Sequence, residues 1–481
     1  MANIAHWRRH VNVNLLNDPA VSEVLSPSTI ESHCRAVGHR WRESFWSPST
    51  TLITFLLQVL DGAKTLRSAV ALLLTQRAAG GQSDLPSADP TAFCQARKRL
   101  PHQVLARILR AVNARIRALV RTDHRWLGRR VWVVDGSSAS MSDTPELQEA
   151  YPQPCGQSAG CGFPVVQFVA LFCWSTGAVV DLVVDSIRPH ELNLVRKLYH
   201  WFKAGDVVAA DRAYGAYVDM VRLLQQGVDC VFRLHQRRSC DFRQGQRLGP
   251  DDRLVTWKKP RRWLASCGVS EQAFKHLPET LPVRLVRIAQ AHRGFRSRTI
   301  VVVTTLLDPI EIPADEIRAL YRDRWTAELN LRSLKITLGM DILRGQSLDV
   351  VHKEIAMHLL AYNLIRLVMW KAARRHGRSL HRLSFAGTLH RLRAALPLLM
   401  SQRNCQCSIE LFDQLLTWIA NGLVPDRPNR VEPRRVKRRP KQYSRLVKPR
   451  QWYREHAHTG ARELHAIRDS HLFIGFPADA E

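Results

Sequence analysis

The sequence predicts an α/β protein in which a five-stranded mixed β-sheet is flanked by helices. Short β-branched segments alternate with amphipathic segments between residues 126 and 235. Their order, β-β-β-α-β-α-β, is typical of a mixed sheet with helices on its faces. Before and after this part of the chain, apolar residues recur at helical spacing over long stretches. We therefore expect helical N- and C-terminal regions around the sheet.

The five strands are predicted from β-branched composition and from the turn residues between them. The first is expected to end in a turn at Asp135-Gly136, and the second and third to be joined by a hairpin at 175–177. The predicted strands are 130–135, 164–174, 178–184, 206–210 and 228–234, with helices over 191–202 and 215–226.

The rest of the chain divides into regions by composition. Two further strands, 283–290 and 298–306, follow an irregular basic stretch, and a long helix begins at Pro313 with acidic residues near its start. The expected regions are a helical N-terminal DNA-binding region (1–125), the first part of a core (126–235), a β-rich insertion (236–308), the second part of the core (309–375), and a helical C-terminal region with a basic tail (376–481).

The chain is strongly basic. Its 481 residues include 71 Lys and Arg against 42 Asp and Glu, which gives a formal net charge of +29. This excess predicts a polyanionic partner, above all nucleic acid. The first residues contain no apolar signal-peptide core, and no stretch reaches the roughly 20 apolar residues that cross a membrane. We expect a cytoplasmic protein without a membrane partner.

Three acidic residues stand out by their context. Asp135 follows the first predicted strand, Asp211 follows the fourth, and Glu328 lies on the helix after the insertion. An aspartate after a strand is more often only a turn or cap residue. A mixed sheet could nevertheless bring two strand ends and an adjacent helix together, so these carboxylates are candidates for one site.

The helix that contains Glu328 gives a stronger signal. At about 100° per residue, Tyr321, Arg324, Glu328 and Lys335 share an arc of roughly 60°, whereas Asp323 lies on the other side. A solvent-exposed face with ion pairs four residues apart would explain Arg324 and Glu328. It would not explain a tyrosine and two cations aligned with one acid, so we interpret this face as functional.

The spacing Tyr321-x2-Arg324-x3-Glu328-x6-Lys335 resembles the Y-(2)-R-(3)-E-(6)-K signature of the bacterial IS-four family of DDE transposases. The first aspartate is followed by Gly-Ser and the second by Arg-Ala-Tyr, and a β-rich insertion precedes the glutamate, as in that family. The resemblance extends over about residues 85–450.

The resemblance implies a ribonuclease-H-like catalytic core in which Asp135, Asp211 and Glu328 are the catalytic, metal-binding residues. Three carboxylates can hold two Mg²⁺ ions for phosphodiester chemistry, and we expect Mn²⁺ to substitute. No Cys or His cluster competes for this role in the sequence.

The resemblance also implies double-stranded DNA as the partner, namely the terminal inverted repeats of an insertion sequence and target DNA. Tyr321, Arg324, Lys335 and Arg212 are the expected DNA-binding residues. A homodimer in the synaptic complex and association with the bacterial nucleoid are expected as well.

Two alternatives to an active transposase remain open. One is a metal-dependent nuclease that cuts without joining, and the other is a sequence-specific DNA-binding protein derived from a transposase. The route of cleavage is a further open point. In some relatives a tryptophan in the last strand of the insertion stacks with a flipped base and supports a hairpin intermediate. The comparable position here is near Ile300, and Trp257 or Trp263 could substitute for that tryptophan.

Overall fold

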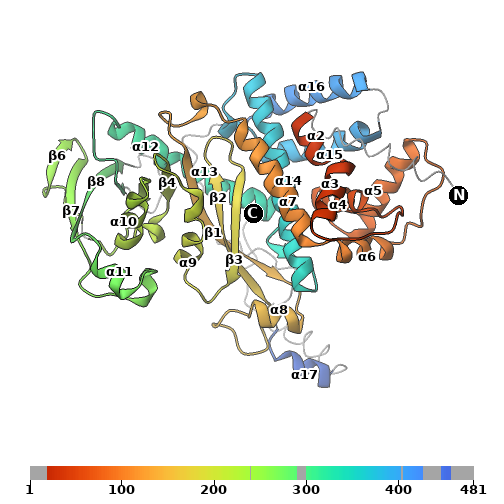
Figure 1. The fold of residues 1–481 in the computed structure, drawn as a ribbon, viewed down its shortest axis with the longest axis horizontal. Coiled ribbons are helices and arrows are strands. Elements are labelled where there is room, and N and C mark those ends of the chain that lie inside the picture. Colours follow the sequence, from red (N-terminus) through yellow and green to blue (C-terminus); the bar gives the residue numbers. More distant parts are fainter. Residues whose placement is uncertain (1–18, 239, 290–298, 402–404, 426–445, 457–481) are drawn as a thin grey trace, which may run out of the picture.

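A computed structural model describes residues 19–238, 240–289, 299–401, 405–425 and 446–456. The fold is α/β, with one large mixed sheet and many helices (Figure 1). The five strands predicted from the sequence form one half of the sheet, in the order β3-β2-β1-β4-β5. Their bounds are β1 Val131–Met141, β2 Val165–Cys173, β3 Val179–Ser186, β4 Val207–Ala210 and β5 Asp229–Arg233.

Within these five strands, β1, β4 and β5 are parallel, while β2 is antiparallel to both of its neighbours. The β2–β3 hairpin turns at Gly177, which has a positive φ of 66° and donates its N–H to the Cys173 carbonyl at 2.7 Å. The predicted hairpin is therefore confirmed. The two predicted helices are present but shorter, as α9 Glu191–Arg196 and α10 Tyr217–Gln225.

The prediction of a five-stranded sheet is wrong, because the insertion continues the same sheet. The antiparallel strand β9 (Thr299–Thr304) pairs with β5, and β8 (Thr280–Ala289), β7 (Asp252–Lys258) and β6 (Gln246–Gly249) follow. The outer edge of β5 would otherwise be an open row of backbone donors and acceptors. A tenth strand, β10 (Ile342–Leu343), pairs in parallel with the end of β1.

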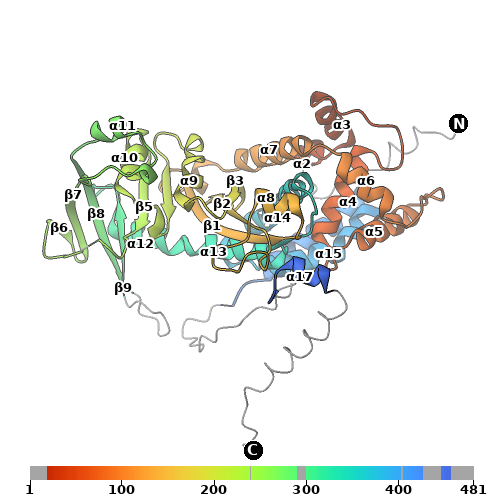
Figure 2. The ribbon, with the colours of Figure 1, turned by 90° about the horizontal axis from the view of Figure 1, so that it is seen from below.

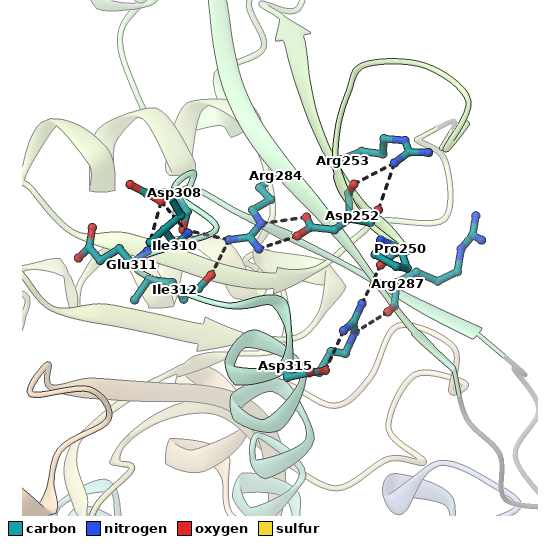
Figure 3. A network of polar contacts seen from close by, with 12 residues as sticks. Pro250, Asp252, Arg253, Arg284, Arg287, Asp308, Ile310, Glu311, Ile312 and Asp315 are labelled. Carbon is teal, nitrogen blue, oxygen red and sulfur yellow. Dashed lines mark hydrogen bonds and ion pairs between the residues drawn. The ribbon is translucent and has the colours of Figure 1, made fainter.

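Polar contacts join the insertion to the helix that follows it. Arg284 on β8 forms a bidentate ion pair with Asp252 on β7, at 2.9 and 2.6 Å, and both residues are buried (Figure 3). The same guanidinium donates to the carbonyl oxygen of Ile312 at 2.7 Å, just before α12 (Ala314–Asp323) begins. Arg318 of α12 donates in turn to the carbonyl of Arg287 at 3.1 Å. The start of α12 is thus fixed to the insertion.

Helices from both ends of the chain pack into one body beside the sheet. Helix α14 contacts α4 and α7 from the N-terminal region as well as α16, and α15 contacts α5. Figures 1 and 2 show this body at one end of the molecule and the insertion strands at the other. Its helices are α2 Pro19–Val24, α3 Pro27–Ala36, α4 Pro48–Leu60, α5 Leu66–Ala79, α6 Thr91–Arg99, α7 His102–Ala118, α14 Leu348–Arg375, α15 Phe385–Ser401 and α16 Cys405–Asn421.

The sheet has a hydrophobic core on each face. One core includes residues of α7 and α14, and the other includes residues of α9 and α10. Helix α14 also caps the β3 end of the sheet, because the Asn363 side chain accepts from the Val179 N–H and donates to its carbonyl, both at 2.8 Å. In the described ranges, no helix is long and apolar enough to cross a membrane.

The basic tail lies largely outside the described residues. Residues 426–445 are not described, and the short helix α17 (Arg450–Glu455) follows them.

Candidate active site

The two aspartates lie side by side at the end of one parallel ladder. Strand β1 pairs with β4 in the register Val131–Val134 against Val207–Ala210. Asp135 directly follows Val134 and Asp211 directly follows Ala210, the last pair of this register, and adjacent strands lie about 4.8 Å apart. The register thus places both carboxylates at the same edge, as the sequence led us to expect.

The turn predicted at Asp135-Gly136 is wrong. Strand β1 continues to Met141, because residues 135–140 pair with residues 170–165 of the long strand β2. Asp135 therefore lies within a strand, at the point where the β4 partner ends; β2 continues the ladder from there, and β10 joins β1 on its other side only at Ser140 and Met141. An antiparallel neighbour on one side is enough to keep the Gly-Ser-Ser segment extended despite its low β propensity.

Helix α13 (Trp325–Arg332) supplies the third carboxylate and packs against β1. The Glu328 side chain accepts a hydrogen bond from Nη2 of Arg324 at 3.0 Å, in an ion pair four residues apart. The Arg324 guanidinium also lies over the Tyr321 ring, 5.3 Å from its centroid. The side chain of Arg324 is only 8% exposed, so this cation is held inside the site.

The charges of all three acids converge on this guanidinium. Burial raises the pKa of Asp135 to about 6, Arg324 opposes that rise, and Glu328 adds to it. The pKa of Arg324 itself is raised, because Tyr321, Glu328 and Asp211 together outweigh the effect of burial. Burial also raises the pKa of Tyr321 to about 12, so this residue stays a neutral phenol at physiological pH.

The remaining predicted residues have different surroundings. Lys335 donates to the Ser137 hydroxyl at 2.7 Å, two residues after Asp135, and so reaches the same strand. Arg212 is exposed and donates to the side chain of Gln236 at 2.8 Å. Asp323 lies apart from the other acids, near His381, whose charge partly offsets the burial that raises the pKa of Asp323.

The predicted single helix is interrupted. Helix α12 ends at Asp323, α13 begins at Trp325, and a π-helical turn follows over Ser333–Thr337. Such turns often occur at functional sites. Spacing at 100° per residue could not have revealed this irregularity, which lies where Lys335 turns toward β1.

Sequence reasoning missed a fourth carboxylate, Glu191, the first residue of α9. It accepts a hydrogen bond from the hydroxyl of Tyr214, and its charge contributes to the raised pKa of Asp135, after burial and Glu328. Burial and the Glu191 charge raise the pKa of Tyr214 well above its usual range. Glu191 follows no strand directly and belongs to no spacing motif, so only the folded chain shows where it lies.

The donor set suits a hard divalent cation. Each of the acids offers carboxylate oxygen, the ligand type that Mg²⁺ and Mn²⁺ prefer. The Oδ1 atom of Asp211 is buried and has no hydrogen-bond partner, so it is available as a ligand. Across the described residues, however, no three acidic, His or Cys side chains are close enough to hold an ion together. Glu328 is instead engaged by Arg324.

Comparison with known proteins identifies the class. The Transposase DDE domain family matches residues 126–364. The transposase InsG for insertion sequence element IS4 of Escherichia coli (strain K12) is 24% identical over 372 residues, covering 76% of this chain and 80% of the relative. A solved structure of a piggyBac transposase synaptic complex with hairpin DNA has a TM-score of 0.41 and 10% identity, covering 87% of this chain and 86% of the other.

The chain belongs to the DDE transposases, the class that the matched domain defines. Within that class it is a member of the IS4 family, as the Tyr-Arg-Glu-Lys signature predicted. It is a DNA transposase, and the DDE domain implies the use of divalent metal ions.

Proposed function

We propose that Asp135, Asp211 and Glu328 are the catalytic residues and that together they hold two Mg²⁺ ions, with Mn²⁺ as a substitute. The observation that carries this proposal is that all three carboxylates interact electrostatically with the same buried guanidinium, that of Arg324. Asp135 lies on β1 and Asp211 directly follows the neighbouring strand β4, while Glu328 lies on α13, which packs against β1.

We also propose that strands β1 to β5 form a ribonuclease-H-like core. Their spatial order, with β2 antiparallel to both neighbours and β1, β4 and β5 parallel, supports this assignment. The remaining strands of the sheet then belong to the insertion and to the connection after α13. On this reading, residues 126–235 and 309–375 are the two parts of the core, separated by residues 236–308.

The reaction that fits this site cleaves the ends of an insertion sequence and joins them to target DNA. Water attacks a phosphorus at the element end, and the bond from phosphorus to the 3′-oxygen breaks to leave a 3′-OH. That hydroxyl then attacks a target phosphodiester and displaces the target's own 3′-OH. Bound metal ions supply the activation of the attacking oxygen and the stabilisation of the leaving oxygen.

Side chains around the acids hold the DNA in this proposal. Arg324 and Lys335 contact phosphates near the element end, and Tyr321, a neutral phenol, positions a backbone phosphate through its hydroxyl. Arg212 is exposed and can reach DNA if it releases Gln236. Glu328 must likewise exchange Arg324 for a metal ion, since the two side chains are paired in the structure.

The element's terminal inverted repeats and target DNA are the proposed partners, and a homodimer is the proposed unit of the synaptic complex. The bacterial cytoplasm, on the nucleoid, is the proposed location because the substrate is chromosomal DNA. A hairpin intermediate is not part of this proposal, because Trp257 is covered by Arg238, whose guanidinium carbon is 3.7 Å from the ring centroid, and Trp263 donates its indole N–H to the Val269 carbonyl at 2.9 Å.

The test is cleavage of a labelled end duplex in Mg²⁺ with Glu328→Gln and, as matched control, Asp323→Asn. Glu328→Gln keeps the shape of the side chain and removes one ligand charge, so we expect DNA binding to persist and cleavage to be lost. Asp323→Asn should cleave normally, because Asp323 lies apart near His381. Equal loss in both variants would contradict the assignment. Cut but unjoined products from the wild-type chain would favour a nuclease instead.

A further inference from the structure

Glu191 connects the two segments that carry the aspartates. Its Oε1 accepts a hydrogen bond from Tyr214, the last residue of the 3₁₀ turn Arg212–Tyr214, which begins directly after Asp211. Tyr214 is 4% exposed, so this bond lies in a largely dry environment, where it is stronger than in water.

The same carboxylate lies against the backbone of β1. A Cβ atom on Gly136 would be 1.7 Å from Oε1 of Glu191 and 2.5 Å from its Cδ, and both distances are shorter than real Cβ contacts. Because residue 136 is glycine, the Glu191 carboxylate occupies the space that a side chain at this position would need. The φ of Gly136 is not positive, so the glycine matters here for space and not for backbone conformation.

The helix that carries Glu191 is itself anchored. Arg196 of α9 forms a bidentate ion pair with Asp219 of α10, with both bonds at 2.8 Å, and Tyr199 donates to the same carboxylate at 2.9 Å. Asp219 is 1% exposed. Helix α9 also packs against β2 and β3, so the base of the Glu191 side chain is fixed relative to the sheet and its carboxylate can act as a rigid brace.

We propose that Glu191 is a positioning residue that sets the separation of Asp135 and Asp211 by bracing Gly136 on one side and Tyr214 on the other. This inference rests on the proposed metal site. Like-charged carboxylates on adjacent strands repel each other, and the strand register fixes their backbones but not their side chains. Because Oε1 is already occupied by the Tyr214 hydroxyl, the acceptor oxygen of Glu191 matters more than its charge.

The experiment measures Mn²⁺ binding to the full chain by the electron paramagnetic resonance signal of free Mn²⁺. The variants are Glu191→Ala, Glu191→Gln, Tyr214→Phe and the Ala/Phe double variant. The control is Asp185→Asn, a carboxylate on β3 that pairs with Lys197. Loss of groups that orient metal ligands weakens metal affinity about 10- to 100-fold. We expect that loss in Glu191→Ala and in Tyr214→Phe, with no further loss in the double variant.

Glu191→Gln should bind Mn²⁺ with an affinity within about threefold of the wild type, because the amide oxygen still accepts a hydrogen bond from Tyr214. This change in affinity is well below the loss expected when an orienting group is missing. If Glu191→Gln is as weak as Glu191→Ala while Tyr214→Phe is normal, Glu191 acts through its charge and the positioning role is overturned. Should Glu191→Ala fail to fold, Tyr214→Phe alone decides.

Asp135→Asn in the same titration separates this inference from the proposed function. Weakened binding in Asp135→Asn with normal binding in both Glu191→Ala and Tyr214→Phe overturns the positioning role alone. Normal binding in Asp135→Asn overturns the proposed metal site, and the positioning role with it.

Discussion

The ion pair between Arg284 and Asp252 predicts a large loss of stability from a single substitution. Arg284 is fully buried and Asp252 is 2% exposed. Asp252→Ala would leave the guanidinium inside the protein without its counter-charge, keeping only the carbonyl oxygens of Ile312 and Asp308, at 2.7 and 3.3 Å. Breaking a buried pair in this way costs about 3–5 kcal/mol.

Hydrogen exchange with mass spectrometry can detect this loss locally, which matters because a chain of 481 residues need not unfold in one step. A loss of about 3–5 kcal/mol corresponds to a roughly 10²- to 10⁴-fold drop in amide protection. We expect the drop in β7 and β8, and also at the start of α12, which follows Ile312 closely. Peptides from α4 and α5, in the distant helical body, should be unaffected.

Two further variants make the reasoning refutable. Asp252→Ala with Arg284→Met removes both charges, so it should recover much of the protection that the single variant loses. Asp241→Ala breaks the pair with Arg243, whose side chain is 91% exposed, and should change little. If the double variant is as unprotected as Asp252→Ala, lost packing and not an uncompensated charge would be the cause.

Three other outcomes follow from the structure. Arg324→Ala should raise the Mn²⁺ affinity of the protein without DNA, because the substitution frees Glu328 and removes a cation from the three acids. The same variant should bind an end duplex more weakly. Unchanged Mn²⁺ affinity in a calorimetric titration would contradict this reasoning. DNA binding should weaken steeply with salt, by about 0.9 in log K per log salt for each phosphate neutralised, and deleting residues 427–481 should flatten the slope if the tail contacts DNA. His358 is buried, and burial lowers its pKa from 6.5 to about 4, so the unfolded chain binds its proton first. The free energy of unfolding is therefore highest above pH 6.5 with respect to this group, and about 3 kcal/mol of it is lost as the pH falls toward 4. In His358→Gln, the midpoint temperature of thermal unfolding should depend less on pH between 6.5 and 4.

Sequence patterns were sufficient where a local rule fixes the structure. The β-branched runs predicted all five strands of the first half of the sheet, and helical spacing put Arg324 and Glu328 on one face, where they form an ion pair. Both inferences depend on residues close in sequence, whose side-chain directions follow from strand or helix geometry.

Tertiary contacts decided the features that the sequence did not reveal. The Asp135-Gly136 pair has the composition of a turn, but pairing with β2 keeps it extended. Strands β6 and β7 lie in a basic stretch without strong alternation, and β7 is a strand because it pairs with β8 along its length. Glu191 reaches the site because α9 packs against β2 and β3 and is joined to α10 by the ion pair between Arg196 and Asp219, which no spacing rule encodes.

Arg324 explains how three acids can share a partly buried site. Carboxylates that approach one another in such surroundings raise each other's pKa. Burial first, and then the charge of Glu328, raise the pKa of Asp135 to about 6. A guanidinium stays charged at any physiological pH, so Arg324 supplies a permanent compensating charge. Its position one helical turn before Glu328 lets it pair with that residue while it faces the two strands. The spacing between arginine and glutamate in the signature therefore has an electrostatic reason within the protein itself, separate from any contact that Arg324 makes with a phosphate.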